Sequence, residues 1–408
     1  MYLSRILLCL IFSTYSFAAE LPSAIPEQMG LSSERLEQIN RVISRNIEAG
    51  NIQGAITAVA RGDHVVHFET HGLMDVEKNI PMQRDAIFIM MSSTKPILGV
   101  AAMIAIEEGW FRPQDPISRY IPELANMSVA VLKEPRDTNV SPVSVRRSEI
   151  PEYRLVPSDR EVTVHDILTH TSGIMSGGLG SAISERSPRE TLKQFIPSLG
   201  STILDFQPGT RWKYSPGTAL DVIARIIEIR SGKSYDAFIK QRIFIPLDMV
   251  DTHYNLPASK ESRRVVISGR DMSRFRNSNT TYFSGSYGLS STARDYLRFE
   301  QMLANGGKLG KNRILSPRTV DLFASNQVGD LYSGLRQGMG FGYTVAVTED
   351  SIISGGRRSK GAFGWGGAFG TRSWTDPAED LSAVLMLQQP HGRTQYEFEN
   401  AIRQAIIE

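Results

Sequence analysis

The 408-residue chain has almost no cysteine and almost no net charge. Its one cysteine, Cys9, lies in an apolar segment near the N-terminus. Disulfide bonds, thiol catalysis and thiolate metal sites are therefore excluded from the rest of the chain. The formal net charge of +2 lacks the basic footprint of a nucleic-acid-binding protein, so nucleic acid is not an expected partner.

The chain also lacks an apolar run long enough to span a bilayer comfortably, which takes roughly 20 residues. The N-terminus instead resembles an export signal, because Arg5 precedes a mostly apolar stretch at residues 6–17 and small residues follow. A cleaved signal peptide at residues 1–19 is favoured over an uncleaved anchor. We expect a periplasmic or secreted protein without a stable membrane span after cleavage. The sequence carries no signal for an oligomeric state.

Strand patterns lie at the two ends of the chain, and helical patterns fill the middle. A helical repeat at residues 36–47 precedes two alternating stretches, 55–60 and 64–71, which predict a β-hairpin. Strands are predicted late in the chain at residues 341–347, 362–365, 372–375 and 382–387, followed by an amphipathic helix at 393–407. Segregated strands and helices favour an α+β fold, with the N- and C-terminal strands in one antiparallel sheet flanked by helices.

The middle of the chain predicts a mainly helical subdomain, at about residues 110–290, inserted into a hydrolase domain of residues 30–408. Helical patterns lie at residues 164–170, 189–199, 218–230, 235–244 and 293–305. Extended connections are expected from 112 to about 160, and a Gly/Ser-rich loop at 172–187. A cleft between the sheet and the helical part is the natural place for a site.

The stretch Met91-Ser92-Ser93-Thr94-Lys95-Pro96 precedes an apolar run, 97–108, that predicts a buried helix. In a helix beginning at Ser92, this serine shares a face with Lys95, whereas Ser93 does not. A lysine whose pKa is lowered by burial can take the proton of a serine nucleophile. Such a pair is common by chance, and an N-cap serine with a solvated lysine is the alternative.

Two later segments supply further candidates. Tyr214 lies on a loop before a helix, where nearby cations would allow it to relay a proton. An ordinary tyrosine packed beside Trp212 is the alternative. The glycine-rich segment 364–371 suggests close approach of another backbone or a ligand, and a backbone N–H there would suit an oxyanion. A tight hairpin turn is the alternative.

Together these segments resemble the serine β-lactamase and penicillin-binding protein superfamily, specifically its class C branch. That family carries Ser-x-x-Lys, Tyr-x-Asn and Lys-Thr-Gly in this order. The chain has Ser92-Ser93-Thr94-Lys95, Tyr214-Ser215-Pro216 and Trp365-Gly366-Gly367. The likeness covers roughly residues 54–388 and includes the stretches VTVHDILTHTSGI and GLSSTARDYLRF. It implies a β-lactamase/transpeptidase-like fold.

The departures from the family pattern favour ester substrates. Trp365, Gly366 and Pro216 offer no side chain that replaces the family's contacts to a substrate carboxylate and side-chain amide. A Trp-Gly-Gly third motif is similar to that of family VIII carboxylesterases, which mainly cleave short-chain esters. An ester has a better leaving group than a peptide amide, so fewer polar contacts suffice.

The resemblance also implies roles for individual residues. Ser92 would be the nucleophile, Lys95 the general base and Tyr214 the proton relay to the leaving group. The backbone N–H groups of Ser92 and Ala368 would form the oxyanion hole. Substrate-binding positions would be Trp365, Gly366 and Gly367.

We therefore expect an exported serine hydrolase that cleaves short-chain carboxylic esters through an acyl-enzyme on Ser92, without a cofactor or a metal. Its partner would be a small-molecule ester or β-lactam-like substrate. A class C-type β-lactamase or D-alanyl-D-alanine carboxypeptidase is one alternative. A non-catalytic cell-wall-binding relative is another, although a pure binder has no need of serine, lysine and tyrosine together.

Three other polar groups are not assigned to catalysis. His64 and His67 point to opposite faces of a predicted strand and have no acidic partner, so they do not predict a metal site. His170 is interpreted as a packed or hydrogen-bonded histidine near a helix end. The basic turn at residues 357–360 is interpreted as solvated rather than as an attractor of anionic substrates.

Overall fold

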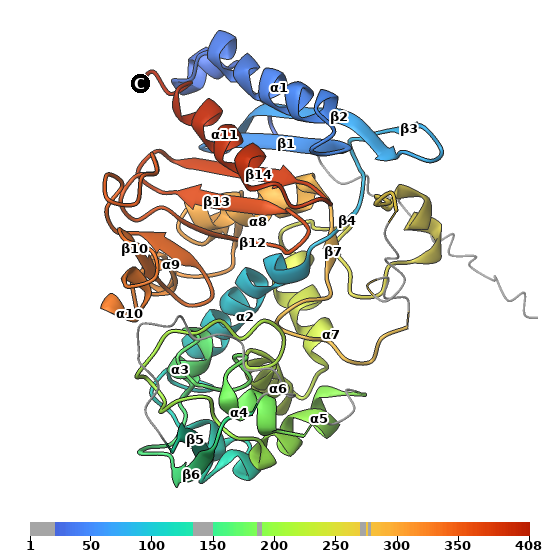
Figure 1. Cartoon of the computed structure of the whole chain (residues 1–408). Coiled ribbons are helices and arrows are strands. Elements are labelled where there is room, and N and C mark those ends of the chain that lie inside the picture. The colour runs from blue at the N-terminus through green and yellow to red at the C-terminus, as the bar shows by residue number, and fades with distance from the viewer. Residues whose placement is uncertain (1–20, 134–149, 186–189, 270–274, 276–278) are drawn as a thin grey trace, which may run out of the picture.

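The computed structural model describes residues 21–133, 150–185, 190–269, 275 and 279–408, so the predicted signal segment and Cys9 lie outside it. Figure 1 shows a sheet with helices on both faces in the upper part and a group of short helices below it. This is the α+β, β-lactamase/transpeptidase-like arrangement expected from the sequence. Within the described ranges, no helix combines the length and the apolar character needed to cross a membrane.

One eight-stranded sheet joins the two ends of the chain, in the order β10-β11-β12-β13-β14-β1-β2-β3. Within the sheet, β1 (Gly54–Arg61) pairs antiparallel with β14 (Leu381–Met386). This pairing confirms the prediction that the N- and C-terminal strands share one antiparallel sheet. The other strands are β2 (His64–Asp75), β3 (Ile80–Pro81), β10 (Met339–Phe341), β11 (Ala346–Thr348), β12 (Phe363–Gly366) and β13 (Arg372–Asp376).

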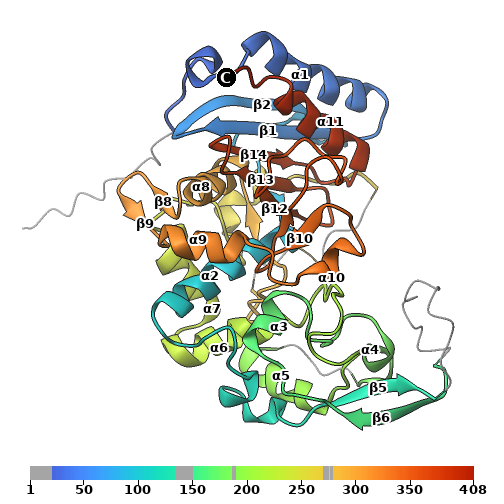
Figure 2. The same ribbon diagram turned by 90° about the vertical axis from the view of Figure 1, so that its left-hand side faces the viewer.

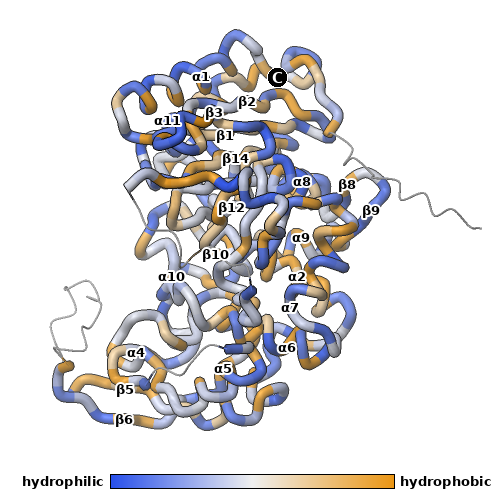
Figure 3. The backbone as a smooth tube through the Cα atoms, turned by 90° about the vertical axis from the view of Figure 1, so that its right-hand side faces the viewer, coloured by the Kyte–Doolittle hydropathy of each residue, from blue (hydrophilic) through white to orange (hydrophobic). Residues whose placement is uncertain are grey.

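Helices cover both faces of this sheet. The terminal helices α1 (Ser33–Glu48) and α11 (Gly392–Arg403) lie side by side on one face (Figure 2), and α8 (Ala293–Ala304) packs on the other. Hydrophilic and hydrophobic stretches alternate along α1 in Figure 3, as expected for a helix that buries one side. Trp374 of β13 is fully buried and packs edge-on against Phe398 of α11, with ring centroids 5.6 Å apart.

The apolar helix α2 (Lys95–Glu107) runs between the sheet and the lower part of the molecule (Figure 1). It has no polar face, and nearly all of its residues are buried. It contacts α6 (Asp221–Ser231) and α9 (Pro317–Ala324). The predicted buried helix is therefore confirmed, and its N-terminus lies where sheet and helices meet.

The lower part is built mostly of short helices: α3 (Val164–Leu168), α4 (Leu179–Ile183), α5 (Leu192–Ser198), α6 and α7 (Tyr235–Ile239). It also contains a hairpin of β5 (Ser128–Leu132) and β6 (Tyr153–Pro157) within the region predicted as extended connections. Small elements complete the chain: β4 (Phe88–Ile89), β7 (Ser290–Ser291), β8 (Lys308–Leu309), β9 (Asn312–Arg313) and α10 (Asp330–Ser333).

Two local predictions were wrong for identifiable reasons. The Gly/Ser-rich run at 172–187 was predicted to be a loop, but it contains helix α4. Gly180 allows this helix to pack directly on another backbone segment, since a Cβ at position 180 would stand 2.3 Å from the carbonyl oxygen of Ile203. The predicted strand at 341–347 is divided into β10 and β11 by a turn. Thr344 in this turn has φ +72°, and Gly342 N donates to Val345 O at 2.8 Å.

Candidate active site

Ser92 lies in a short 3-10 turn, Met91–Thr94, that leads into α2. Residues three apart eclipse one another in a 3-10 helix, so this turn still places Ser92 on the same side as Lys95. Met91 has φ +47°, a strained conformation for a residue with a side chain. The strain sits directly before Ser92, which is partly exposed, and strained backbone of this kind is concentrated at functional positions.

The structure brings Ser92, Lys95 and Tyr214 together. Lys95 Nζ lies 3.3 Å from Ser92 Oγ, and the Tyr214 hydroxyl donates to the same Oγ at 2.8 Å. Tyr214 is 122 residues away in the chain and comes from the loop that precedes α6. The Lys95 ammonium also lies 4.9 Å from the centroid of the Tyr214 ring.

Lys95 is completely buried and has three hydrogen-bond partners. Besides Ser92, its Nζ donates to the carbonyl oxygens of Pro216 and Ser286, each at 2.9 Å. Burial lowers the pKa of Lys95, and the charges of Tyr214 and Asp221 oppose that shift. In a neutral amine, the two carbonyls would take its two N–H groups, and the lone pair would face Ser92 Oγ.

Ser93 has a different environment from Ser92. It is buried, its Oγ is 2.9 Å from Thr371 Oγ1, and its carbonyl oxygen accepts from the Tyr296 hydroxyl at 2.7 Å. These contacts join the 3-10 turn Met91–Thr94 to the turn before β13 and to α8, so Ser93 is a buried packing residue in this structure.

Asp221 is a functional candidate that the sequence reasoning missed. This buried carboxylate accepts hydrogen bonds from the Tyr282 hydroxyl (2.6 Å), Ser284 Oγ (2.7 Å) and Ser286 N (3.2 Å). It thereby holds the segment whose Ser286 carbonyl accepts from Lys95. An aspartate within the apolar pattern of residues 218–230 was the available signal, since buried carboxylates need partners.

His170 holds the loop that carries Tyr214. Its carbonyl oxygen accepts from Lys213 N at 3.0 Å, and its ring Nδ1 accepts from Ser215 N at 3.3 Å. The ring is buried, 4.8 Å from the Tyr214 ring centroid, and burial holds its pKa far below the ordinary range. The prediction of a packed, hydrogen-bonded histidine is confirmed.

The third predicted segment forms a tight turn between β12 and β13. Gly367 N donates to Thr371 O at 2.8 Å, and Gly370 N donates to Gly367 O at 2.9 Å. The turn also approaches another backbone closely, because a Cβ on Gly367 would stand 2.3 Å from Met90 O. Both interpretations of the glycines are therefore correct, and exposed Ala368 lies in a turn that packs against the residues before Ser92.

Aromatic side chains surround Tyr214. Trp365, partly exposed on β12, lies 5.6 Å from the Tyr214 ring and 5.4 Å from the Phe341 ring. Trp212 stacks beside Tyr214 at 6.3 Å and contacts Tyr332 at 4.7 Å. Trp365, which stands where the family's third motif has a lysine, is therefore part of an apolar wall beside Tyr214.

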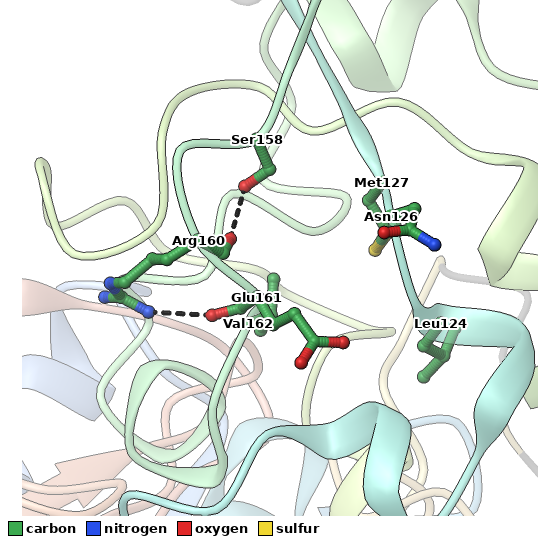
Figure 4. Close-up of a pocket in the computed structure, with 7 residues that line it drawn as sticks. All are labelled: Leu124, Asn126, Met127, Ser158, Arg160, Glu161 and Val162. Atoms are coloured by element: carbon green, nitrogen blue, oxygen red, sulfur yellow. Dashed lines mark hydrogen bonds between the residues drawn. The ribbon is translucent and has the colours of Figure 1, made fainter.

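A separate hollow of about 170 Å³ lies in the lower part of the molecule. Figure 4 shows its lining residues, which come from the segments next to β5 and β6 and include none of the residues around Ser92: Leu124, Asn126, Met127, Ser158, Arg160, Glu161 and Val162. The geometry around Ser92, and not this hollow, carries the elements of a catalytic site.

Comparisons with known proteins identify the family of the chain. The chain matches the sequence model of the Beta-lactamase family over residues 39–406. Protein Rv1367c of Mycobacterium tuberculosis (strain ATCC 25618 / H37Rv) is 32% identical over 365 residues, which cover 84% of this chain and 87% of that protein. Esterase EstB of Burkholderia gladioli is 26% identical over 407 residues, covering 90% and 94%.

The fold is also shared with solved structures. A family VIII carboxylesterase superposes with a TM-score of 0.70 at 17% identity, over 92% of this chain and 99% of that one. This likeness shows the predicted β-lactamase/transpeptidase-like fold. The chain therefore belongs to the Beta-lactamase family and is a serine hydrolase.

Proposed function

We propose that the protein is an exported esterase that cleaves short-chain carboxylic esters through an acyl-enzyme on Ser92. The observation that carries the proposal is the contact of Ser92 Oγ with both Lys95 Nζ and the Tyr214 hydroxyl. The sequence likeness to a protein named Esterase EstB supports an ester as the substrate.

In the acylation step, neutral Lys95 takes the proton of Ser92 as Oγ attacks the ester carbonyl. The oxyanion of the tetrahedral intermediate would accept hydrogen bonds from the N–H groups of Ser92 and Ala368. Support comes from the packing of the 367–370 turn against Met90, next to Ser92. The C–O bond then breaks, and the proton passes from Lys95 through Tyr214 to the leaving alkoxide.

Deacylation runs the same proton path in reverse. A water molecule takes the place of the departed alcohol, Tyr214 and Lys95 accept its proton, and the hydroxide attacks the acyl carbon. The bond to Ser92 Oγ breaks, Oγ regains a proton, and the carboxylic acid leaves. The role of Tyr214 depends on its position at 2.8 Å from Ser92 Oγ, which His170 and the neighbouring backbone help to fix.

The aromatic wall supports esters over β-lactams. Trp365 and Gly366 replace side chains that hold the substrate in β-lactamases, and Pro216 contributes a carbonyl to Lys95 instead of an amide to the substrate. An alkoxide leaves more readily than an amide nitrogen. Esters that are held by few polar contacts would therefore still be hydrolysed.

The direct test is hydrolysis of p-nitrophenyl butyrate by the wild type, Ser92→Ala and the matched control Ser93→Ala, with nitrocefin as a second substrate. Ser92→Ala is expected to lose activity and labelling by a fluorophosphonate probe, whereas Ser93→Ala keeps both. Full activity in Ser92→Ala would exclude the proposed nucleophile. Efficient nitrocefin turnover with negligible ester cleavage would instead indicate a β-lactamase.

Export is proposed from the N-terminal pattern alone. N-terminal sequencing of protein recovered from a periplasmic fraction should begin shortly after Ala19. Recovery of the uncleaved chain in the cytoplasm would contradict export without affecting the proposed chemistry.

A further inference from the structure

Two neighbouring loops beside the edge of the sheet expose aliphatic side chains. Ile352 is 89% exposed, more than any other large hydrophobic residue in the described ranges, and Ile353 is 60% exposed. Leu335, in the loop between α10 and β10, is 61% exposed. Three of the five most exposed large hydrophobic residues of the described chain therefore lie in these two loops. Single exposed apolar residues are ordinary, but a concentration of them marks an interaction surface.

Backbone contacts hold the two loops together. Gly338 O accepts from Glu349 N and from Asp350 N, each at 3.0 Å. A Cβ on Gly338 would stand 2.4 Å from Ser354 N, so this glycine allows the first loop to lie directly on the second. Strand β10, which follows Gly338, is the edge strand of the sheet and packs beside α10 (Figure 1). Leu335 and the two isoleucines therefore belong to one region of the surface.

The turn that carries the isoleucines is fixed through its backbone. Asp350 Oδ1 accepts from Ile352 N and from Ile353 N, each at 2.9 Å. Ser354 N donates to Asp350 O at 3.0 Å. The isoleucine side chains take no part in these bonds, so the fold of the turn does not account for their apolar character. Their replacement should leave the turn intact.

The exposed charges of the two loops are all positive. Arg336, Arg357 and Lys360 are exposed, whereas Glu349 and Asp350 are only partly exposed. Within the described part of the chain, none of these three cations donates a side-chain hydrogen bond or forms an ion pair. Their charges are therefore available to an anionic partner.

Arg358 differs from the cations around it. It is buried, pairs with Glu399 of α11 and lies 4.5 Å above the ring of Trp374. The prediction of a solvated basic turn is therefore wrong for Arg358, which anchors the loop to the sheet and to α11. Arg357 and Lys360 are exposed, as that prediction expected.

We propose that these loops dock the protein on an anionic phospholipid bilayer. The docking surface consists of three aliphatic and three basic residues: Leu335, Arg336, Ile352, Ile353, Arg357 and Lys360. Aliphatic side chains that enter the headgroup region and cations that meet lipid phosphates both contribute to binding at a bilayer surface. Protein–protein interfaces, in contrast, are enriched in aromatic residues and depleted of lysine. Such docking lies on the bilayer and does not span it.

The docking surface adjoins the aromatic wall of the active site. Tyr332 O accepts from Leu335 N at 2.9 Å and from Arg336 N at 3.0 Å. The Tyr332 ring lies 4.7 Å from that of Trp212, which stacks beside Tyr214. A docked molecule would therefore hold the Tyr214 side of its active site close to the bilayer. The docking itself does not depend on the proposed ester hydrolysis.

Vesicle co-sedimentation of the full chain tests the apolar part of the docking surface. Vesicles of phosphatidylglycerol and phosphatidylcholine are compared with vesicles of phosphatidylcholine alone. The wild type should bind the anionic vesicles more tightly, and its affinity should fall as the salt concentration rises. Ile352→Ser/Ile353→Ser should weaken this binding roughly tenfold or more. The matched control Ile25→Ser/Ile245→Ser removes isoleucines of 61% and 66% exposure from other surfaces and should bind as the wild type does.

A second set of variants tests the charges. Arg336→Gln/Arg357→Gln/Lys360→Gln should weaken binding to anionic vesicles roughly tenfold or more and remove the preference for them. The control Lys193→Gln/Lys308→Gln/Lys311→Gln loses the same charge at exposed lysines and should stay within about twofold of the wild type. Lys308 belongs to the β8–β9 hairpin, which lies on the opposite side of the molecule from α10 and β10 in Figure 2.

Docking and catalysis are separate results in this design. Both docking-surface variants should hydrolyse p-nitrophenyl butyrate as the wild type does, because they leave Ser92, Lys95 and Tyr214 unchanged. No binding of the wild type to anionic vesicles, or binding that neither docking-surface variant weakens, would overturn the proposal. Self-association without vesicle binding, abolished by Ile352→Ser/Ile353→Ser in analytical ultracentrifugation, would also overturn it and assign the surface to a second copy of the chain.

Discussion

The two sides of Ser92 differ in how their polar groups are satisfied. On the base side, Lys95 donates to two carbonyls and to Ser92, and Asp221 fixes the segment that supplies one of those carbonyls. On the substrate side, Trp365 belongs to an aromatic wall, and its buried indole N–H has no partner in the described structure. The hydrogen bonds of the base side are made within the protein, whereas the substrate side keeps a hydrogen-bond donor for a ligand. Changes on the base side should therefore alter the chemistry, and changes on the substrate side the choice of substrate.

The largest effect is expected from removing the base. Lys95→Met deletes the amine without leaving a charge in the buried site, and it should lower kcat for p-nitrophenyl butyrate by roughly 10³-fold or more. Burst-phase kinetics should show no acyl-enzyme. Lys78→Met, at an exposed lysine in the turn between β2 and β3, is the matched control and should behave as wild type. A lysine variant with normal kcat would show that Lys95 only packs.

Tyr214→Phe should have the next largest effect. It removes the hydroxyl that lies 2.8 Å from Ser92 Oγ but keeps the ring that packs on His170 and Trp365. We expect kcat to fall roughly 10²-fold, the lower range for loss of a positioned proton donor. The loss should be smaller for p-nitrophenyl than for alkyl esters, because p-nitrophenolate leaves without a proton. Equal losses on both would argue against a relay to the leaving group.

Asp221→Asn should change the pH dependence more than the maximal rate. The negative charge of Asp221 raises the pKa of Lys95 against the effect of burial, so its removal lowers that pKa further. Tyr214 and His170 are the other titratable groups that act on Lys95. The acid limb of kcat/KM, where Lys95 loses its proton, should therefore move to lower pH in Asp221→Asn. An unchanged limb in a folded variant would reduce Asp221 to a packing role.

The same comparison explains what the sequence could predict. The early hairpin, the last three strands, the terminal helices and the buried helix α2 follow from periodic patterns that are local in the chain, and the structure confirms them. The spacing of Ser92 and Lys95 is also local. Tyr214 and the third segment were found only because motifs in a fixed order indicated a family. Asp221 was missed, because its importance lies in which distant groups it contacts and no periodicity encodes such contacts.

The smallest effect concerns the sheet that supports the site. Glu300 of α8 is buried against β13, with Thr375 Oγ1 2.8 Å from its carboxylate, and burial raises its pKa to about 7. Since the unfolded carboxyl has its ordinary, lower pKa, the native state holds the proton more tightly between about pH 4.5 and 7. Stability is therefore greatest below this window and falls as the pH rises through it.

Glu300→Gln should remove that dependence and raise the free energy of unfolding at pH 8 by about 1–3 kcal/mol. Urea unfolding at pH 5 and pH 8 measures the change, with exposed Glu34→Gln as the control. A variant that loses stability equally at both pH values would mean that the hydrogen bonds of Glu300 outweigh the cost of burying its charge.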